Sequence, residues 1–457
     1  MKKSGIMNII LIVSDTFRYD HLRCNGNKTM RTPYLDKLAS NSVVFDRAYA
    51  NSHPTVPARA DLVTGKYTFT FMGWQPLPTE EITLAQLLAQ KGYLTTAVAD
   101  TPFLVKESYN YDRGFQDFIY IRGQDYKRAE GYDVRPYRVH ETDYAAPATM
   151  LAAERWLQRH YKEKFFLYVD TWDPHEPWDP PHWYTELYHP DYDGKVIPPV
   201  YGKYKERGVS DEDLEIAHAC YCGEATMVDR WVGRLLDTVE ALNLAEKTAI
   251  IFTSDHGFYF GEHGYFGKSV MDRATGTYGP AMIRDTNFYR SPLYEEVIHV
   301  PMLVSVPGCK PRRTNAIVSL SDVVPTILDL AEVEAQTHVQ GQSIVPILQG
   351  DDDAGKPFVV TSWPLHNPGE VTRAVDAFGR NVKEWLPVTV TTNEWSLIYS
   401  ARHEPVELYH LSTDPKQQNN IASTEPERVK ELHAMLLSLL KNCNTSARLL
   451  EPRSELE

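Results

Sequence analysis

Three polar residues follow predicted strands at points where they could hold a metal ion. Asp15 ends the apolar run Ile9–Val13, and Asp255 and His256 follow the run at 248–254. Two carboxylates and an imidazole at one sheet edge favour Zn²⁺ or Mn²⁺, while Ca²⁺ and Mg²⁺ remain possible. Each motif alone has a plainer interpretation, because Asp15 could cap a helix and Asp-His-Gly could form a turn. Together they predict one divalent ion.

Thr55 opens the stretch Thr55-Val-Pro-Ala-Arg59 and could supply a fourth oxygen to that ion. Its hydroxyl is a poor nucleophile at neutral pH, but metal coordination at a helix N-terminus would activate it. Arg59 lies one turn further on, on the same helix face, where it could hold Thr55 and the oxygens of a tetrahedral anion. The alternatives are a helix cap for Thr55 and a structural ion pair for Arg59.

Two further residues could act on a bound anion. His175 lies in Trp172-Asp-Pro-His-Glu-Pro-Trp178, a loop stiffened by a proline on each side. Its imidazole could protonate a leaving oxygen, and a His packed among aromatic side chains is the alternative. Lys268 ends a glycine-rich run and could contact the anion, or could be a solvated surface Lys. The candidate catalytic residues are therefore Thr55, Arg59, His175 and Lys268.

These residues need a scaffold that brings distant segments together, and the hydrophobic pattern predicts one. Short apolar runs alternate with amphipathic stretches, which is typical of an α/β fold with a mainly parallel sheet sandwiched by helices. Open sheets of this kind bind ligands at the carboxyl ends of their strands. The predicted strands are residues 8–14, 94–99, 165–170, 248–254 and 301–306, and the predicted helices are residues 82–91, 143–162, 211–242 and 322–332.

The pattern changes after residue 350, where Gly350-Asp-Asp-Asp-Ala-Gly355 has the composition of a linker. Short strand-like runs and one amphipathic helix follow it. The sequence therefore predicts a catalytic domain at residues 1–350 and a small C-terminal α+β subdomain with an antiparallel sheet at residues 351–457. The predicted elements of the subdomain are strands at 358–363, 386–392 and 395–400 and a helix near 425–441.

The composition limits the partners. The chain of 457 residues has 47 Lys and Arg against 61 Asp and Glu, a net charge of −14. An acidic surface disfavours nucleic acid and anionic membranes, whereas a few local cations still allow a small-molecule anionic ester substrate. The five Cys form no disulfide framework, and the first apolar run is too short for a signal peptide or a membrane span. We expect a cytoplasmic protein, and a homo-oligomer is left open.

The residues from Thr55 to Gly65 resemble the sulfatase signature, Cys/Ser-x-Pro-x-Arg followed by Thr-Gly, and six further segments are similar to this family of the alkaline phosphatase superfamily. The resemblance covers most of the chain. It implies an alkaline phosphatase-like mixed sheet between helices, a small C-terminal sheet and a metal-dependent ester hydrolase. The six segments are NIILIVSDTFRYDHL, DPHEPW, SDHGFYFGEHGYFGK, PLYEEVIHVPMLVSVPG, SLSDVVPTILDLAEV and ELYHLSTDPKQQNN.

The sequence departs from the family at four places. The signature Cys or Ser matures to the aldehyde formylglycine, but oxidation of Thr55, a secondary alcohol, would give a ketone. Thr16 stands where members often have a second Asp, and Asp100 and Pro102 stand where many have an anion-binding Lys and His. Residues 269–291 are an insertion that could form a lid and restore positive charge, or be merely a surface loop. Its arginines are Arg273, Arg284 and Arg290.

We therefore predict a hydrolase that cleaves a phosphate or phosphonate ester through Thr55. Members of the wider superfamily use a metal-bound Thr to attack phosphorus, and the single-metal set resembles phosphonate monoester hydrolases with the nucleophile changed. The alternatives are a sulfatase that works without formylglycine and a non-catalytic pseudoenzyme that binds an anion, which the intact metal set disfavours. The predicted metal ligands are Asp15, Thr55, Asp255 and His256.

Overall fold

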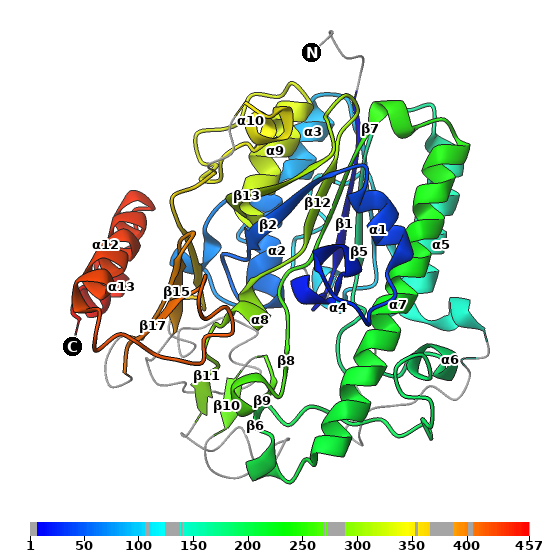
Figure 1. Ribbon diagram of the computed structural model, residues 1–457. Coiled ribbons are helices and arrows are strands. Elements are labelled where there is room, and N and C mark those ends of the chain that lie inside the picture. The colour runs from blue at the N-terminus through cyan, green and yellow to red at the C-terminus, as the bar shows by residue number, and fades with distance from the viewer. Residues whose placement is uncertain are drawn as a thin grey trace.

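One large sheet runs through the centre of the molecule (Figure 1). The computed structural model describes residues 7–105, 109–123, 138, 140–268, 270–272, 288–351, 355–365, 387–400 and 405–456. The strands of the large sheet are β1 (Asn8–Ser14), β2 (Val43–Tyr49), β3 (Leu94–Ala99), β4 (Asp117–Tyr120), β5 (Phe165–Thr171), β7 (Thr248–Thr253), β12 (Met302–Ser305) and β13 (Arg312–Ser319).

The strand order is β13-β2-β12-β7-β1-β5-β3-β4. Strand β12 runs antiparallel to both of its neighbours, and the other pairings in this sheet are parallel. The predicted mixed, mainly parallel sheet is therefore confirmed. Strands β5, β1 and β7 are direct neighbours at its centre, so their carboxyl ends meet at one edge.

Helices cover both faces of the sheet. Along β1, Ile9, Leu11 and Val13 belong to one hydrophobic core, and Ile10 and Ile12 belong to the other. Because both faces are buried, the strand is apolar throughout rather than alternating. One face packs against α2 (Thr55–Thr64), α3 (Leu84–Gln90), α4 (Pro102–Val105), α9 (Val323–Leu330) and α10 (Val345–Gln349), and the other against α1 (Pro33–Ala39), α5 (Ala145–His160), α6 (His182–Thr185) and α7 (Asp211–Ala241).

The predicted strands and helices of this part of the chain all exist, with ends within two residues of those expected. Three strands of the sheet, β2, β4 and β13, were not predicted. Strands β2 and β13 form one end of the sheet and pair in parallel along most of their length. The sheet is therefore wider than the sequence pattern indicates.

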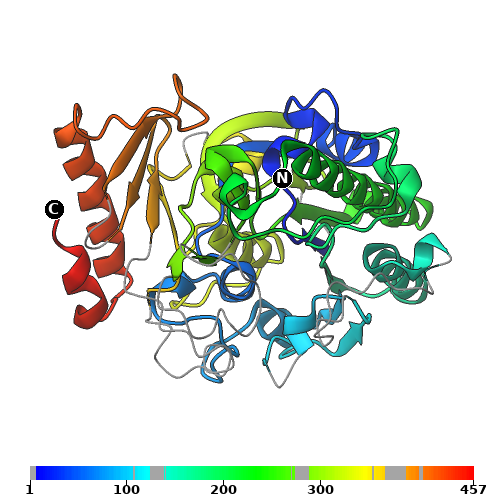
Figure 2. The same ribbon diagram turned by 90° about the horizontal axis from the view of Figure 1, so that it is seen from below.

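The C-terminal part forms a second, smaller layer beside the main body (Figure 2). Its antiparallel sheet has the order β14-β15-β16-β17, and α12 packs on one face through Leu432 and Leu436. The predicted antiparallel sheet and terminal helix are confirmed. These elements are β14 (Val359–Ser362), β15 (Val388–Thr391), β16 (Trp395–Tyr399), β17 (Glu407–His410), α12 (Pro426–Asn442) and the short α13 (Ala447–Leu450).

Two small sheets are built from β6, which precedes α7 in the chain, and from strands that lie between β7 and β12. Strands β6 (Gly202–Lys203), β9 (Tyr265–Gly267) and β8 (Tyr259–Phe260) form one, and β10 (Val270–Asp272) pairs with β11 (Phe288–Arg290) in the other. The short helix α8 (Glu295–Ile298) follows. Most of the predicted insertion at 269–291, including Arg273 and Arg284, lies outside the described residues, and its role stays a prediction.

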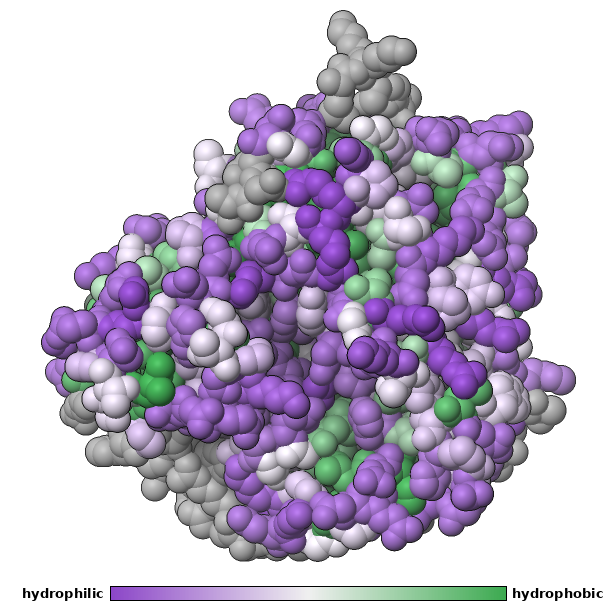
Figure 3. Space-filling model, viewed as in Figure 1, coloured by the Kyte–Doolittle hydropathy of each residue, from purple (hydrophilic) through white to green (hydrophobic). Residues whose placement is uncertain are grey.

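The face seen in Figure 3 is mainly hydrophilic, with apolar side chains scattered among polar ones. Among the described residues, every helix is too short or too polar to cross a lipid bilayer.

Candidate active site

The carboxyl ends of β5, β1 and β7 bring together the residues predicted to hold a metal. Asp15 directly follows β1, Asp255 follows β7 after one residue, and His256 is next in the chain. One ligand atom from each of these three side chains lies within 4.8 Å of the other two, and all three residues are buried. The structure thus assembles the predicted set at the edge where an open α/β sheet binds its ligands.

Thr55 reaches this set from the first turn of α2. The residue before the helix is Pro54, and the hydroxyl of Thr55 lies 3.1 Å from Nε2 of His256. Nδ1 of His256 donates to the carbonyl of Gly257, so Nε2 accepts the proton of Thr55. Burial lowers the pKa of His256 well below its usual value, which keeps the imidazole neutral. Because the residue that caps α2 is Pro54 and Thr55 is already in the first turn, the helix-cap interpretation of Thr55 is wrong.

Arg59 is fully buried beneath the set and contacts carboxylates. Its guanidinium donates to both oxygens of Asp170 at 2.9 and 2.8 Å, to Asp15 at 3.0 Å and to Asp255 at 2.5 Å. It thus ties together the ends of β5, β1 and β7. The contacts match the structural ion pair considered as an alternative, and a contact with substrate oxygens stays a prediction. Asp170 was not predicted, although it ends the run FFLYVD and the strand-end argument applies to it equally.

The charges of these buried side chains fit a divalent cation. Asp15, Asp170 and Asp255 bring three carboxylates against the guanidinium of Arg59 and the ammonium of Lys268. Burial, and then the charge of Asp15, raises the pKa of Asp255 well above its usual value. A cation between the two carboxylates would relieve this repulsion, and the neutral Nε2 of His256 offers a nitrogen ligand.

Lys268 lies at the site but contacts several acceptors. Its Nζ donates to the hydroxyl of Thr16 at 2.7 Å and lies 3.1 Å from Glu176 and 3.6 Å from Asp15. Burial raises the pKa of Asp15, but Lys268 and then Arg59 outweigh it and hold that pKa well below the usual value. Lys268 therefore keeps Asp15 ionised, and its contact with a substrate anion stays a prediction.

Thr16 positions the carboxylates of Asp15 and Asp255, a role that the sequence did not reveal. Its hydroxyl donates to Asp15 at 2.6 Å, and its backbone N–H donates to Asp255 at 3.0 Å. Its φ of 60° lies in the left-handed region, which is costly for a β-branched residue and is found mostly where the surroundings enforce it. Thr16 thus fixes both carboxylates, and no local pattern in the sequence signals this.

His175 is buried and stacks on Trp172 with ring centroids 4.0 Å apart. Burial lowers the pKa of His175 to about 4, so the ring is neutral at pH 7. Its Nδ1 donates to the carbonyl of Glu176 at 2.6 Å, which leaves the lone pair on Nε2. To protonate a leaving oxygen, His175 must first gain a proton at Nε2. A bound anion would favour that step, and the role of general acid stays a prediction.

Asp100 adds little negative charge at neutral pH, although it occupies a position where many sulfatases have a cation. Burial, and then the charge of Asp173, raises the pKa of Asp100 to about 8. The carboxyl group accepts from Thr149 at 2.6 Å and from the backbone N–H of Trp172 at 2.5 Å. Pro102 begins α4. The side chains at these two positions therefore supply no cation, as predicted.

The C-terminal sheet supports the segment that leads into Thr55. The backbone of Ser362, at the end of β14, accepts from His53 at 2.9 Å and donates to Asn51 at 2.8 Å. His53 also contacts the carbonyl of Lys268 through Nε2 at 2.7 Å, and its ring lies 4.9 Å from that of His256. His53 thus belongs to the site. Its place two residues before Thr55 was the only signal for it.

Comparisons with known proteins agree with this architecture. The sulfatase family model matches residues 7–333, and a model of the C-terminal part of N-sulphoglucosamine sulphohydrolase matches residues 285–445. Arylsulfatase K of Gallus gallus is 25% identical over 484 residues, which cover 96% of this chain and 83% of the relative. An arylsulfatase of Clostridium perfringens is 24% identical over 498 residues, which cover 95% of this chain and 94% of the relative.

Solved structures show the same fold. The crystal structure of phosphonate monoester hydrolase of Agrobacterium radiobacter has a TM-score of 0.75 to this chain at 21% identity and covers 96% of both chains. The family match spans residues 7–333, which include Thr55 and the metal-binding set. On these grounds the chain belongs to the sulfatase family of ester hydrolases.

Proposed function

We propose that this protein hydrolyses a phosphate or phosphonate ester with Thr55 as the nucleophile. The observation that carries the proposal is the contact between the hydroxyl of Thr55 and Nε2 of His256 at 3.1 Å, inside the buried metal-binding set. A hydroxyl in this position, at the first turn of α2, also faces the positive end of the helix dipole. The dipole favours the ionised form of the hydroxyl, and the contact places Oγ1 where an ion held by Nε2 would also reach it.

The chemistry of Thr55 favours phosphorus over sulfur. A formylglycine hydrate releases sulfate by re-forming the aldehyde, and a Thr has no second hydroxyl on the same carbon to do this. A Thr ester of phosphate or phosphonate can instead be cleaved by attack of water on phosphorus. The absence of an aldehyde precursor at residue 55 therefore excludes the route used by sulfatases that carry formylglycine.

The residues present fit a divalent ion, and divalent metal binding is general in this family. Asp15, Asp255 and His256 would hold it, with Thr55 as a fourth ligand, and the mixed oxygen and nitrogen set favours Zn²⁺ or Mn²⁺. When bound, the ion supplies positive charge against the charge that develops on oxygen during the reaction.

The chain's own residues then have distinct tasks. Thr55 releases its proton to solvent and its Oγ1 bonds to phosphorus, while the bond from phosphorus to the ester oxygen breaks. His175, protonated at Nε2, gives its proton to the departing alcohol. Water then attacks phosphorus and the bond from phosphorus to Oγ1 breaks. One proton of the water passes to Thr55, the other leaves with the acid, and His175 takes up a proton from solvent. Arg59 and Thr16 keep the two carboxylates in place during both steps.

A panel of nitrophenyl esters tests the proposal. The esters are a phosphate, a phosphate diester, a phenylphosphonate and a sulfate, each assayed with Zn²⁺ and with Mn²⁺. We expect a phosphorus ester to be the best substrate and Thr55→Val, which keeps the branched shape, to lose at least about 10³-fold in kcat/KM. Thr55→Ser, produced without a formylglycine-generating enzyme, keeps the hydroxyl and is the matched control, with most of the activity retained.

Sulfate ester hydrolysis is the second candidate, because the relatives described above are named as arylsulfatases. In that case the nitrophenyl sulfate would be the best substrate. Thr55→Cys separates the two functions when it is produced with a formylglycine-generating enzyme. We expect this variant to gain sulfatase activity and to lose phosphoesterase activity, since an aldehyde hydrate and an alkoxide favour different intermediates.

A further inference from the structure

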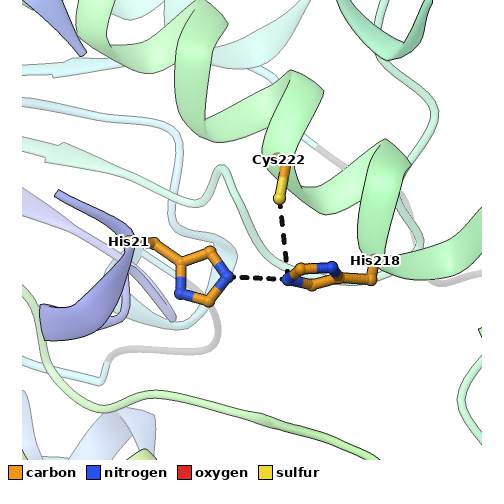
Figure 4. A group of neighbouring side chains, drawn as sticks. All are labelled: His21, His218 and Cys222. Atoms are coloured by element: carbon orange, nitrogen blue, oxygen red, sulfur yellow. Dashed lines mark hydrogen bonds between the residues drawn. The ribbon is translucent and has the colours of Figure 1, made fainter. Parts of the chain in front are cut away.

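A second group of metal-binding side chains joins the segment after β1 to the long helix α7. His21 ends the short helix η1 (Tyr19–His21) and faces His218 and Cys222 of α7 (Figure 4). The Nε2 atoms of the two rings are 2.8 Å apart, and Sγ of Cys222 lies 3.6 Å from Nε2 of His218. His21 and Cys222 are buried and His218 is half-buried. One ligand atom from each lies within 4.8 Å of the other two.

A carboxylate orients the first of these ligands. Oδ1 of Asp20 lies 2.8 Å from Nδ1 of His21, and Asp20 is itself held by two bonds from Arg18. The carboxylate is an acceptor, so Nδ1 carries the hydrogen and the lone pair of a neutral His21 is on Nε2, which points at His218 (Figure 4). Histidine ligands of metals commonly show this arrangement with a carboxylate on the other nitrogen.

Helix geometry places the other two ligands, His218 and Cys222, next to each other. His218 and Cys222 are four residues apart on α7, so their side chains lie on one face of the helix. In a tetrahedral zinc site with bonds of about 2.0 Å to nitrogen and 2.3 Å to sulfur, a nitrogen and a sulfur lie about 3.5 Å apart and two nitrogens about 3.3 Å. The first spacing is present, and the second needs the two rings to separate by about 0.5 Å.

We propose that His21, His218 and Cys222 bind a Zn²⁺ ion, with the fourth position left to water beside the half-buried His218. A thiolate with two imidazoles suits zinc and disfavours Mg²⁺ and Ca²⁺, which prefer oxygen. This site is separate from the candidate active site in its residues and in its donor set. It does not depend on which ester the enzyme cleaves.

The position of this ion gives it a role in the fold. The hydroxyl of Tyr221, also on α7, accepts from the backbone of Arg18 and donates to the carbonyl of Thr16, each at 2.9 Å. Helix α7 therefore already holds the segment that carries Asp15 and Thr16. A zinc ion between His21 and α7 would fasten the same segment at its far end and so stabilise the two residues that begin it.

The alternative is a hydrogen-bonded pair of neutral imidazoles beside an ordinary buried Cys, which packs as a small apolar residue. Cobalt distinguishes the two, because Co²⁺ bound to a thiolate absorbs in the near ultraviolet by charge transfer from sulfur. The full-length protein is stripped with a chelator and titrated with Co²⁺. Asp15, Asp255 and His256 offer no thiolate, so this band reports the second site alone.

Cys222→Ser should lose the band, and Cys220→Ser, a buried Cys two residues away on the same helix, should keep it. After dialysis against trace Zn²⁺, wild type and Cys220→Ser should hold one more zinc per chain than Cys222→Ser. If Cys222→Ser does not fold, His218→Gln at the half-buried position serves instead, with Co²⁺ binding at least about tenfold weaker. A wild type without the band, or a band that survives Cys222→Ser, would overturn the proposal.

Discussion

A single side chain, that of Arg59, holds the metal-binding residues in place. It is completely buried. Its five N–H groups face Asp170, Asp15, Asp255, the carbonyl of Thr55 and, at 3.5 Å, Thr101. The sequence places Arg59 on the same helix face as Thr55, because the two are four residues apart. It cannot identify the acceptors, since they come from the ends of three strands that are neighbours only in the folded sheet.

His175 makes a prediction about leaving groups and pH. Burial lowers the pKa of His175 to about 4, so only about one molecule in a thousand carries the proton at pH 7. An acid catalyst of this kind gives a kcat/KM that falls as the pH rises above 4. His175→Gln should remove this fall and slow alkyl esters at pH 6 by at least about 10²-fold, with much less effect on nitrophenyl esters.

The measurement is a pH series of kcat/KM for both ester classes in wild type and His175→Gln. Esters with poor leaving groups depend on a proton donor, whereas nitrophenolate departs without one. An equal loss on both classes would identify His175 as a packing or binding residue.

Asp100 makes a prediction about stability. Burial raises the pKa of Asp100 to about 8, whereas an unfolded Asp has a pKa of about 3.9. The folded state therefore keeps a proton that the unfolded state has lost. The resulting stability is fully present below about pH 4 and is lost as the pH rises to about 8.

Asp100→Asn should remove this loss. Its amide can donate to the hydroxyls of Thr149 and Thr171 and accept from the backbone of Trp172, in place of a protonated carboxyl. The measurement is the melting temperature at pH 5 and at pH 8.5. The variant should lose less stability than wild type between these values, and equal losses would mean that Asp100 is ionised in the folded protein.

At the scale of elements, the strands that carry the site were the most predictable. Strands β1, β5 and β7 are buried on both faces, and each is therefore an uninterrupted apolar run that ends at a polar residue. Strands β2 and β13 were missed because they carry charged residues. Asp46 of β2 and Arg313 of β13 bond to each other at the side of the sheet, so their charges mark a pairing and not a loop.

The site residues that directly follow these strands were predictable, because the apolar runs mark where the strands end. Asp15, Asp255 and His256 follow apolar runs, and a parallel sheet brings such positions together. Thr16, Glu176 and His53 were not predictable, because their roles arise from contacts with Lys268, which is far from each of them in the sequence.

The close approach of β7's end to α8 yields a prediction for Gly257. A Cβ at this position would lie 2.1 Å from the carbonyl oxygen of Glu296, so backbone must move to accept it. Gly257→Ala should destabilise the protein by about 1–3 kcal/mol and displace His256, with a loss of activity larger than the loss of stability explains. Gly73→Ala, at a glycine with open space around it, is the matched control.

Thermal melting and kcat/KM under stabilising conditions check this prediction. Gly257→Ala should differ from wild type in both quantities, and Gly73→Ala in neither. A fully active Gly257→Ala variant of wild-type stability would mean that the segment at 255–257 can shift without disturbing the site.

At the scale of the molecule, the active site is assembled from segments that are far apart in the sequence. The segments at 15–18, 53–59, 170–176, 255–268 and 362 all contribute to it or support it. Buried carboxylates repel one another where these segments meet, since burial and then the charge of Asp15 raise the pKa of Asp255. A bound cation should therefore stabilise the whole fold and not only the catalytic step.

Metal removal tests this. In the Cys222→Ser background, which isolates the active site, Zn²⁺ or Mn²⁺ at about 100 times its Kd should add about 2.7 kcal/mol to the free energy of unfolding. At the same ion concentration, Asp255→Asn should gain much less stability. The substitution removes a charged ligand of the ion, and it also removes the repulsion with Asp15 that the ion would relieve. Melting curves with and without chelator measure the gain, and the same gain in Asp255→Asn would place the ion elsewhere.

The most direct test of Thr55 as the nucleophile is mass spectrometry of the protein quenched in acid during turnover of a phosphonate or phosphate ester. The peptide that contains Thr55 should carry the phosphoryl or phosphonyl group on that residue, and the modification should disappear when substrate is exhausted. Thr55→Val should show neither the modification nor turnover. An unmodified Thr55 during rapid turnover, together with an active Thr55→Val variant, would contradict the mechanism and make water the nucleophile.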